Sequence, residues 1–184
     1  MRFPVAVLLA ATLFGCTEKP VPAPLAVFVP PLPSPPSDRA AACVRPAEKA
    51  AFGIAGLKSQ LMVTAISCGG EDKYNAFVTK YRPDLVVEEK SLVGFFGRAY
   101  GRRGQQTHDD FITQLANSQS QLSLKFGQNF CRENSGMLDE VMALKTGAEL
   151  PAYAASKPIQ QSMAVEDCPA TPTPPARTPP ARRR

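Results

Sequence analysis

The stretch "FGIAGLKSQLMVTAISCGG", residues 52–70, decides the fold because its apolar residues recur at helical spacing. Polar residues such as Lys58, Gln60 and Thr64 lie between them. The apolar positions, three or four residues apart, are Ile54, Leu57, Leu61, Ala65 and Cys68. This pattern is typical of the buried stripe of an amphipathic helix, and the glycine pair at 69–70 ends it.

Helical periodicity continues towards the C-terminus and predicts four more helices. The second follows the acids at 71–72 and ends at Pro83, the third spans about 84–100, and the fourth opens with a capping box of Thr107 and Asp110. The fifth lies within 128–145 with Gly147 as its stop, and "GRRG" at 101–104 is a loop. The expected inward-facing residues are Tyr74, Phe77, Val78 and Tyr81; Leu85, Leu92, Phe96 and Ala99; Phe111, Leu115, Ser118 and Leu122; and Phe130, Leu138, Val141 and Met142. We predict an all-α fold, a small disulfide-braced bundle of four to six helices over residues 47–157.

The N-terminus carries an export signal over residues 1–15. Arg2 precedes an apolar run of about a dozen residues, whereas crossing a bilayer takes ~20. The ending Leu13-Phe14-Gly15-Cys16 resembles the lipobox of bacterial lipoproteins. That resemblance implies cleavage before Cys16 and acylation of its thiol, which anchors the chain in a membrane. The alternative is a secreted protein cut elsewhere, for which "VPA" at 21–23 is the nearest site.

Proline-rich segments flank the helical domain. Nine prolines between positions 17 and 46 predict that the linker, residues 16–46, is an extended spacer of ~3.1 Å per residue. The tail, residues 158–184, ends in "PATPTPPARTPPARRR", with six prolines and four arginines. Both segments are expected to be disordered or polyproline-like.

The net charge of +5 comes from the ends of the chain. Between the cysteines at 43 and 168, fourteen Lys and Arg balance fourteen Asp and Glu. Apart from Arg2 in the signal, the excess lies on the tail at Arg177, Arg182, Arg183 and Arg184. A basic tail without a basic folded face argues against nucleic acid as a partner and favours anionic polymers of the cell envelope. The alternative is a tail that only improves solubility.

Four cysteines remain if Cys16 is acylated: Cys43, Cys68, Cys131 and Cys168. An even number in an exported protein predicts disulfides, and four cysteines allow three pairings. Two lie within the helical body and two flank it, so the economical pairing is Cys68–Cys131 inside the core and Cys43–Cys168 across its ends. Each long loop contributes ~4–5 kcal/mol in the chain-entropy model. Zinc is disfavoured because the chain has no C-x-x-C pair and a single histidine.

The best local candidate for recognition lies around the predicted "GRRG" loop. It gathers charges and one aromatic ring within six residues, a composition suited to anionic groups or to acids and rings of a partner. These candidate binding residues are Arg98, Tyr100, Arg102 and Arg103. The alternative is an ordinary turn between helices.

Catalytic patterns are weak, and we expect neither enzymatic activity nor a cofactor or metal. His108 in "THDD" could act as a general base, but a solvated residue in the first turn of a helix is the favoured interpretation. The acidic pairs at 88–89 and 139–140 could suggest glycosidase carboxylates, and solvated helix faces are again favoured. A small envelope hydrolase that uses His108 remains an alternative hypothesis.

A second resemblance covers roughly residues 52–144. The motifs "LKSQLMV" at 57–63, "YNAF" at 74–77, "LAN" at 115–117 and "FC" at 130–131 resemble a group of small exported proteobacterial proteins of unknown function. This resemblance implies a helical domain with a Cys68–Cys131 bridge and implies no activity.

The leading hypothesis is a non-enzymatic envelope lipoprotein that binds an unidentified envelope partner. The alternative is a structural tether that bridges membrane and cell wall through the basic tail. Thr17, in place of an aspartate after the anchor, favours the outer membrane on the periplasmic side, by resemblance to enteric sorting rules.

Overall fold

The computed structural model describes residues 43–169, and within that range the regular elements are helices. They are α2 (Pro46–Cys68), α3 (Glu71–Lys80), α4 (Arg82–Tyr100), η1 (Gly101–Arg103), α5 (Gly104–Phe126), α6 (Gln128–Asn134), α7 (Gly136–Ala143), η2 (Gly147–Glu149) and α8 (Leu150–Ala155). The predicted all-α, disulfide-braced class is confirmed. The signal, most of the predicted linker and the arginine-rich end of the tail lie outside the described residues.

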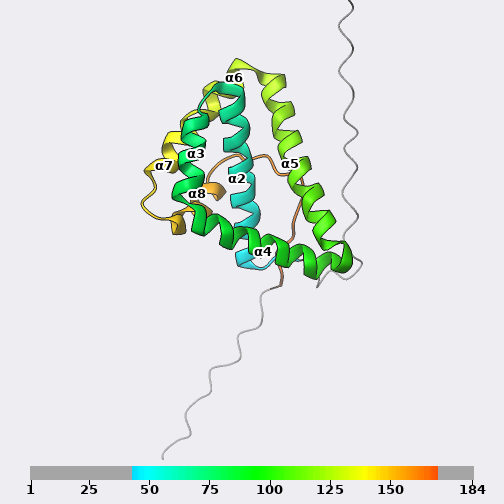
Figure 1. The fold of residues 1–184 in the computed structure, drawn as a ribbon. Helices are drawn as coiled ribbons and strands as arrows, with labels where there is room; N and C mark the ends of the chain where they lie inside the picture. The colour runs from blue at the N-terminus through cyan, green and yellow to red at the C-terminus, as the bar shows by residue number, and fades with distance from the viewer. Residues whose placement is uncertain (1–42, 170–184) are drawn as a thin grey trace, which may run out of the picture.

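Helix α2 runs through the middle of the molecule, between α3 and α5, and α4 crosses below it (Figure 1). Its 23 residues make it about 34 Å long. Leu57 and Leu61 are completely buried, as the apolar stripe predicted. By length and composition α2 could cross a membrane, with a mean hydropathy of 1.3 over its most apolar window. Since 67% of that window is buried inside the fold, the apolar character is explained by a core helix.

Two hydrophobic clusters lie on either side of α2. One packs the C-terminal half of α2 against α3, α7 and α8 and includes the buried Phe77 and Tyr81. The other joins the N-terminal half of α2 to α4 and α5. At its centre Phe52 makes edge contacts with Phe95 and Phe111, each with ring centroids 5.1 Å apart. Such pairs add ~1 kcal/mol beyond their buried area, so this aromatic group fixes the three-helix junction.

Both predicted disulfides are present, one at each end of α2. Cys68 pairs with Cys131 of α6, and Cys43 pairs with Cys168, with Cα atoms 5.5 and 4.7 Å apart. The pairing therefore matches the prediction. Cys68 and Cys131 are half-buried at the end of the bundle rather than inside its core, because α2 ends at Cys68.

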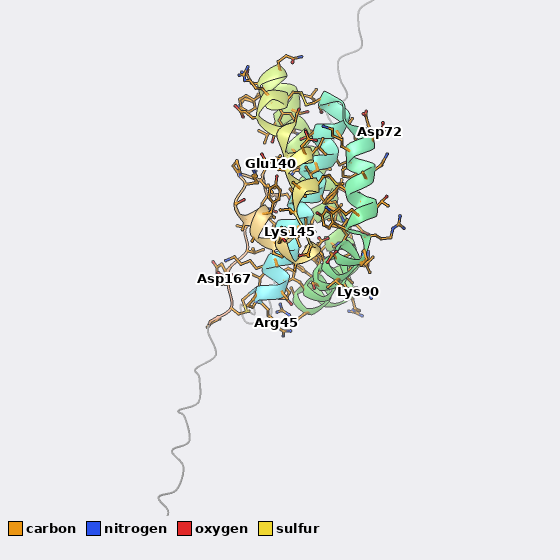
Figure 2. The ribbon with its side chains drawn as sticks, turned by 90° about the vertical axis from the view of Figure 1, so that its left-hand side faces the viewer. Arg45, Asp72, Lys90, Glu140, Lys145 and Asp167 are labelled. Atoms are coloured by element: carbon orange, nitrogen blue, oxygen red, sulfur yellow. A yellow bond between two sulfur atoms is a disulfide. The ribbon has the colours of Figure 1, made fainter. Side chains whose placement is uncertain are left out.

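The folded body extends beyond the predicted C-terminal boundary. Residues 158–168, which the sequence assigned to the tail, pack back along the bundle, with Ile159 against one core cluster and Met163 against the other. Near Cys168, Asp167 forms a single parallel bridge with Val44. Arg45 and Asp167 therefore lie at the same end of the molecule (Figure 2). Cys168 was the sequence signal for this longer boundary, because its disulfide with Cys43 holds the preceding residues against the fold.

Four further sequence predictions are corrected. The "GRRG" segment is not a plain loop but the 3₁₀ helix η1, and α5 begins directly at Gly104. Thr107 is thus inside α5, where its hydroxyl donates to the Arg103 carbonyl at 2.9 Å instead of capping the helix. The expected fifth helix is divided into α6 and α7 at Ser135. On α5, Gln119 is buried in the stripe, whereas Ser118 and Leu122 are only half-buried.

Candidate functional site

The predicted basic recognition cluster does not form one surface. Arg98 is occupied within the fold: its Nη2 donates to Glu48 Oε2 at 2.6 Å and to the Cys43 carbonyl at 3.0 Å. Its guanidinium also lies 5.5 Å from the ring centroid of Phe95. Arg98 is therefore a brace between α4 and the start of α2, and its assignment as a binding residue was wrong.

The other members of that cluster divide between the fold and the surface. Tyr100 is half-buried and stacks on Phe96 with ring centroids 5.9 Å apart. Only Arg102 and Arg103 of the four candidates are exposed, on η1. The other predicted sites, Cys16 and the tail residues Arg177, Arg182, Arg183 and Arg184, lie outside the described residues.

His108 is buried, not solvated as the sequence predicted. Its side chain packs edge-on against Phe96, with ring centroids 5.5 Å apart, and the residue is only 5% exposed. Its Nε2 lies 3.2 Å from Glu89 Oε1, and Glu89 Oε2 lies 3.7 Å from Lys58 Nζ. This polar group links α5, α4 and α2 and accounts for the histidine as part of the helix packing.

The two acidic pairs differ from each other. Asp139 and Glu140 on α7 are exposed, as expected, and form ion pairs with Lys73 and Lys157. Glu140 lies on the outer surface of the bundle (Figure 2). Glu88, by contrast, is only 4% exposed, so the prediction of a solvated face at 88–89 was wrong for this residue.

Glu88 lies beside a pocket of about 260 Å³ between α2, α4 and the segment that carries η2 and α8. One wall is a row of small apolar residues on α2, where alanines at helical spacing leave room beside the neighbouring helix. The opposite wall is one face of α4, with polar residues one turn apart. The lining residues are Ala47, Ala50, Ala51, Ile54, Asp84, Val87, Glu88, Ser91, Gly147 and Pro151.

The rim of this pocket is set by Asp84 and Gly147. The Asp84 carboxylate lies in the space that a side chain at position 147 would occupy. A larger residue at 147 would therefore require the Asp84 side chain to move. Ser91, at the far side, donates its hydroxyl to the Val87 carbonyl at 3.2 Å and keeps its oxygen lone pairs available as acceptors.

The Glu88 carboxyl has no hydrogen-bond partner within the described residues. Both of its oxygens are shielded from water. Burial raises the pKa of Glu88 from 4.5 to about 7; the charge of Lys58 opposes that rise, and Glu89 adds to it. A buried carboxyl without partners is costly, because transfer of an unpaired polar group out of water costs ~1–3 kcal/mol even when it is neutral. Such a group in a pocket is a candidate for ligand binding.

The sequence signal for this site is the helical spacing of the residues on α4. Residues 85, 88, 92, 96 and 99 share one helical stripe, and four of the five were predicted to face inward. The acid in the middle of that stripe must be buried with them. The interpretation of 88–89 as an acidic pair on a solvated face overlooked this spacing.

No group of three or more His, Cys, Asp or Glu side chains that could hold a metal ion occurs in residues 43–169. Comparison of the chain with protein-family models, with curated proteins and with solved structures yields no match. The lipobox-like and proteobacterial resemblances therefore stay predictions.

Proposed function

We propose that this protein is a non-enzymatic binding module of the cell envelope, anchored in a membrane through an acyl group on Cys16. The observation that carries the proposal is the pair of disulfides that brace both ends of α2. Disulfides form and persist in oxidising compartments outside the cytosol, which agrees with an export signal. The outer membrane, with the domain facing the periplasm, is the proposed location.

The position of the chain ends supports a tethered arrangement. The Cys43–Cys168 disulfide brings the point where the linker enters beside the point where the tail leaves. The folded body is thus attached at one end of α2, and the rest of its surface is left open to a partner. The pocket beside Glu88 is the proposed binding site, because it is a concave, largely apolar site with an unpartnered polar group.

A role in catalysis by His108 has less support. The buried ring is enclosed by Phe96 and the side chains around Glu89, and it does not line the pocket. A general base must reach the proton it abstracts within hydrogen-bond distance or through one water. We therefore propose a structural role for His108.

The unreduced intact mass of the protein, extracted from membranes of its host, tests this proposal. The expected mass is that of residues 16–184 plus acyl groups, less two hydrogens for each disulfide. A mass without lipid, from a chain that begins elsewhere, would overturn the membrane anchor. A mass four hydrogens higher than expected would show that both disulfides are reduced, and it would remove the support that they give to export.

A further inference from the structure

The chemistry of the pocket indicates which class of ligand the proposed binding module binds. Three polar side chains line it, all from one face of α4: Asp84, Glu88 and Ser91. Two are carboxyls and one is a hydroxyl, and no basic residue is among the lining residues. The remaining lining is aliphatic. Such a site rejects anions and offers a cation both charge and hydrogen-bond acceptors.

We propose that this pocket binds a short aliphatic primary ammonium group. Its cationic head pairs with Glu88 and Asp84. Its hydrocarbon body lies on the aliphatic wall formed by α2. This inference rests on the proposed function and specifies what the module binds.

The acceptors match a primary ammonium in number. An ammonium has three N–H donors. The carboxyls at 84 and 88 are one helical turn apart, and the Ser91 hydroxyl is the next polar group along the same face. Guanidinium is planar and needs a bidentate partner held in its plane, so a row of single acceptors suits ammonium better.

The size of the pocket limits the hydrocarbon body. About 260 Å³ is below the ~300–1,000 Å³ typical of sites for drug-sized ligands. Ala47, Ala50 and Ala51 provide an aliphatic surface without hydrogen-bonding side chains. A chain of about four carbons, as in a small amine or a lysine side chain, is the chemistry that this wall accepts.

The unpartnered acid supplies the driving force. In the free protein neither oxygen of Glu88 has a hydrogen-bond partner or contact with water. Because both oxygens are shielded in the free protein, the proposal requires the Glu88 side chain to turn towards the pocket, where the ammonium forms a charge-assisted pair with the carboxylate. A buried carboxylate without a partner has a much higher free energy than a paired one. Pairing with the ammonium removes this penalty and so strengthens binding.

Calorimetric titration of the full mature chain in detergent tests the proposal, with n-butylammonium as the probe. The titration is run at about pH 8.5, where Glu88 is ionised and the amine is still protonated. We expect saturable binding of n-butylammonium and at least about tenfold weaker binding of n-butanol, which has the same body without charge.

Three variants localise the site. Glu88→Gln removes the charge, and Ala50→Leu fills the apolar wall without a change of charge; each is expected to weaken binding at least about tenfold. Glu89→Gln is the matched control, since Glu89 is the adjacent acid but lies outside the lining and pairs with Lys58. It is expected to leave affinity within about twofold. Equal binding of n-butylammonium and n-butanol, or unchanged binding in Glu88→Gln, would overturn the proposal.

A further arm distinguishes the source of the ammonium. If Nα-acetyl-lysine N-methylamide binds as tightly as n-butylammonium, the proposal is supported with a lysine of a peptide as the ligand. If only n-butylammonium binds, the proposal is supported with a free amine as the ligand. A lipidated, disulfide-bonded chain that binds neither overturns the ammonium site and leaves the envelope proposal intact, whereas an unlipidated chain that binds does the reverse.

Discussion

Arg98 on α4 donates a 2.6 Å hydrogen bond to Glu48 in the first turn of α2. The same Glu48 oxygen accepts the backbone N–H of Arg45 at 2.8 Å, as a capping residue does. Arg98 also donates to the carbonyl of Cys43, which belongs to the disulfide at this end of the molecule. One guanidinium therefore joins α4, the start of α2 and the Cys43–Cys168 bridge.

Arg98→Ala should lower the free energy of unfolding by about 2–3 kcal/mol. The substitution leaves the buried Glu48 with an uncompensated charge, and loss of a hydrogen bond to a charged group costs ~1.5–3 kcal/mol. Denaturant unfolding followed by circular dichroism measures the difference. Arg102→Ala is the control, because Arg102 is exposed and its loss should change stability by less than about 0.5 kcal/mol. Equal effects of the two substitutions would contradict the brace.

Glu88→Gln should remove a pH dependence of stability. Below pH 4.5 the carboxyl is protonated in both the folded and the unfolded state, so it causes no difference. As the pH rises from 4.5 to about 7, the unfolded chain releases this proton while the folded chain retains it, and stability falls. With the pKa of Glu88 raised to about 7, the penalty above pH 8 is ~3 kcal/mol.

Unfolding curves at pH 5 and pH 8.5 test this effect. The wild type should lose stability between the two values, and Glu88→Gln should lose much less and be the more stable protein at the higher pH. Glu89→Gln, at a half-buried position, should keep most of the wild-type loss, because burial is the largest cause of the raised pKa of Glu88 and the charge of Glu89 is a smaller one. A flat wild-type profile would show that Glu88 finds a partner when it ionises.

The helical class was predictable because local periodicity determines it. Helix α2 matched its predicted stripe at Ile54, Leu57 and Leu61. The break after α3 lies at Tyr81, two residues before the predicted boundary, and Pro83 is in the first turn of α4. The pairing of the cysteines also followed from their positions in the chain, two within the helical body and two flanking it. The helices depend on residues that are neighbours in the sequence. The disulfides join distant segments, and the cysteines mark those segments directly in the sequence.

The candidate site was not predictable by the same reasoning. Arg98 was predicted to be a binding residue and His108 to be solvated. In the structure, Arg98 on α4 pairs with Glu48 on α2, and His108 on α5 lies beside Glu89 on α4. Only the crossing of α4 over α2 brings an acid to a row of alanines. The pocket is a product of packing between helices, and no local pattern specifies which helices meet.

Removal of either disulfide should destabilise the fold by a similar amount. The double variants Cys43→Ser/Cys168→Ser and Cys68→Ser/Cys131→Ser open loops with sequence separations of 125 and 63. Each should cost about 2–5 kcal/mol. Because loop-closure entropy grows only logarithmically, the twofold difference in length adds only about 0.6 kcal/mol.

Denaturant unfolding without reductant compares the two variants, and hydrogen exchange separates them. Loss of Cys43–Cys168 should increase exchange in residues 158–168, because this bridge holds the end of the segment, at Asp167, beside Val44. Loss of Cys68–Cys131 should increase exchange in α6 instead. Protection of 158–168 that survives the first variant would show that packing alone holds this segment.

Two glycines should respond in opposite directions to alanine. Gly104, the first residue of α5, faces the backbone of α4: a Cβ there would lie 2.8 Å from the Phe96 carbonyl oxygen and from the Gly97 Cα. Gly94, on the exposed side of α4, has open space where its Cβ would lie. Gly104→Ala should cost about 1–3 kcal/mol, since the two helices must move apart. Gly94→Ala should stabilise by about 0.5–1 kcal/mol, because alanine loses less conformational entropy in a helix. Thermal unfolding of the two variants measures both changes, and a stabilised Gly104→Ala protein would mean that α4 and α5 do not approach this closely in solution.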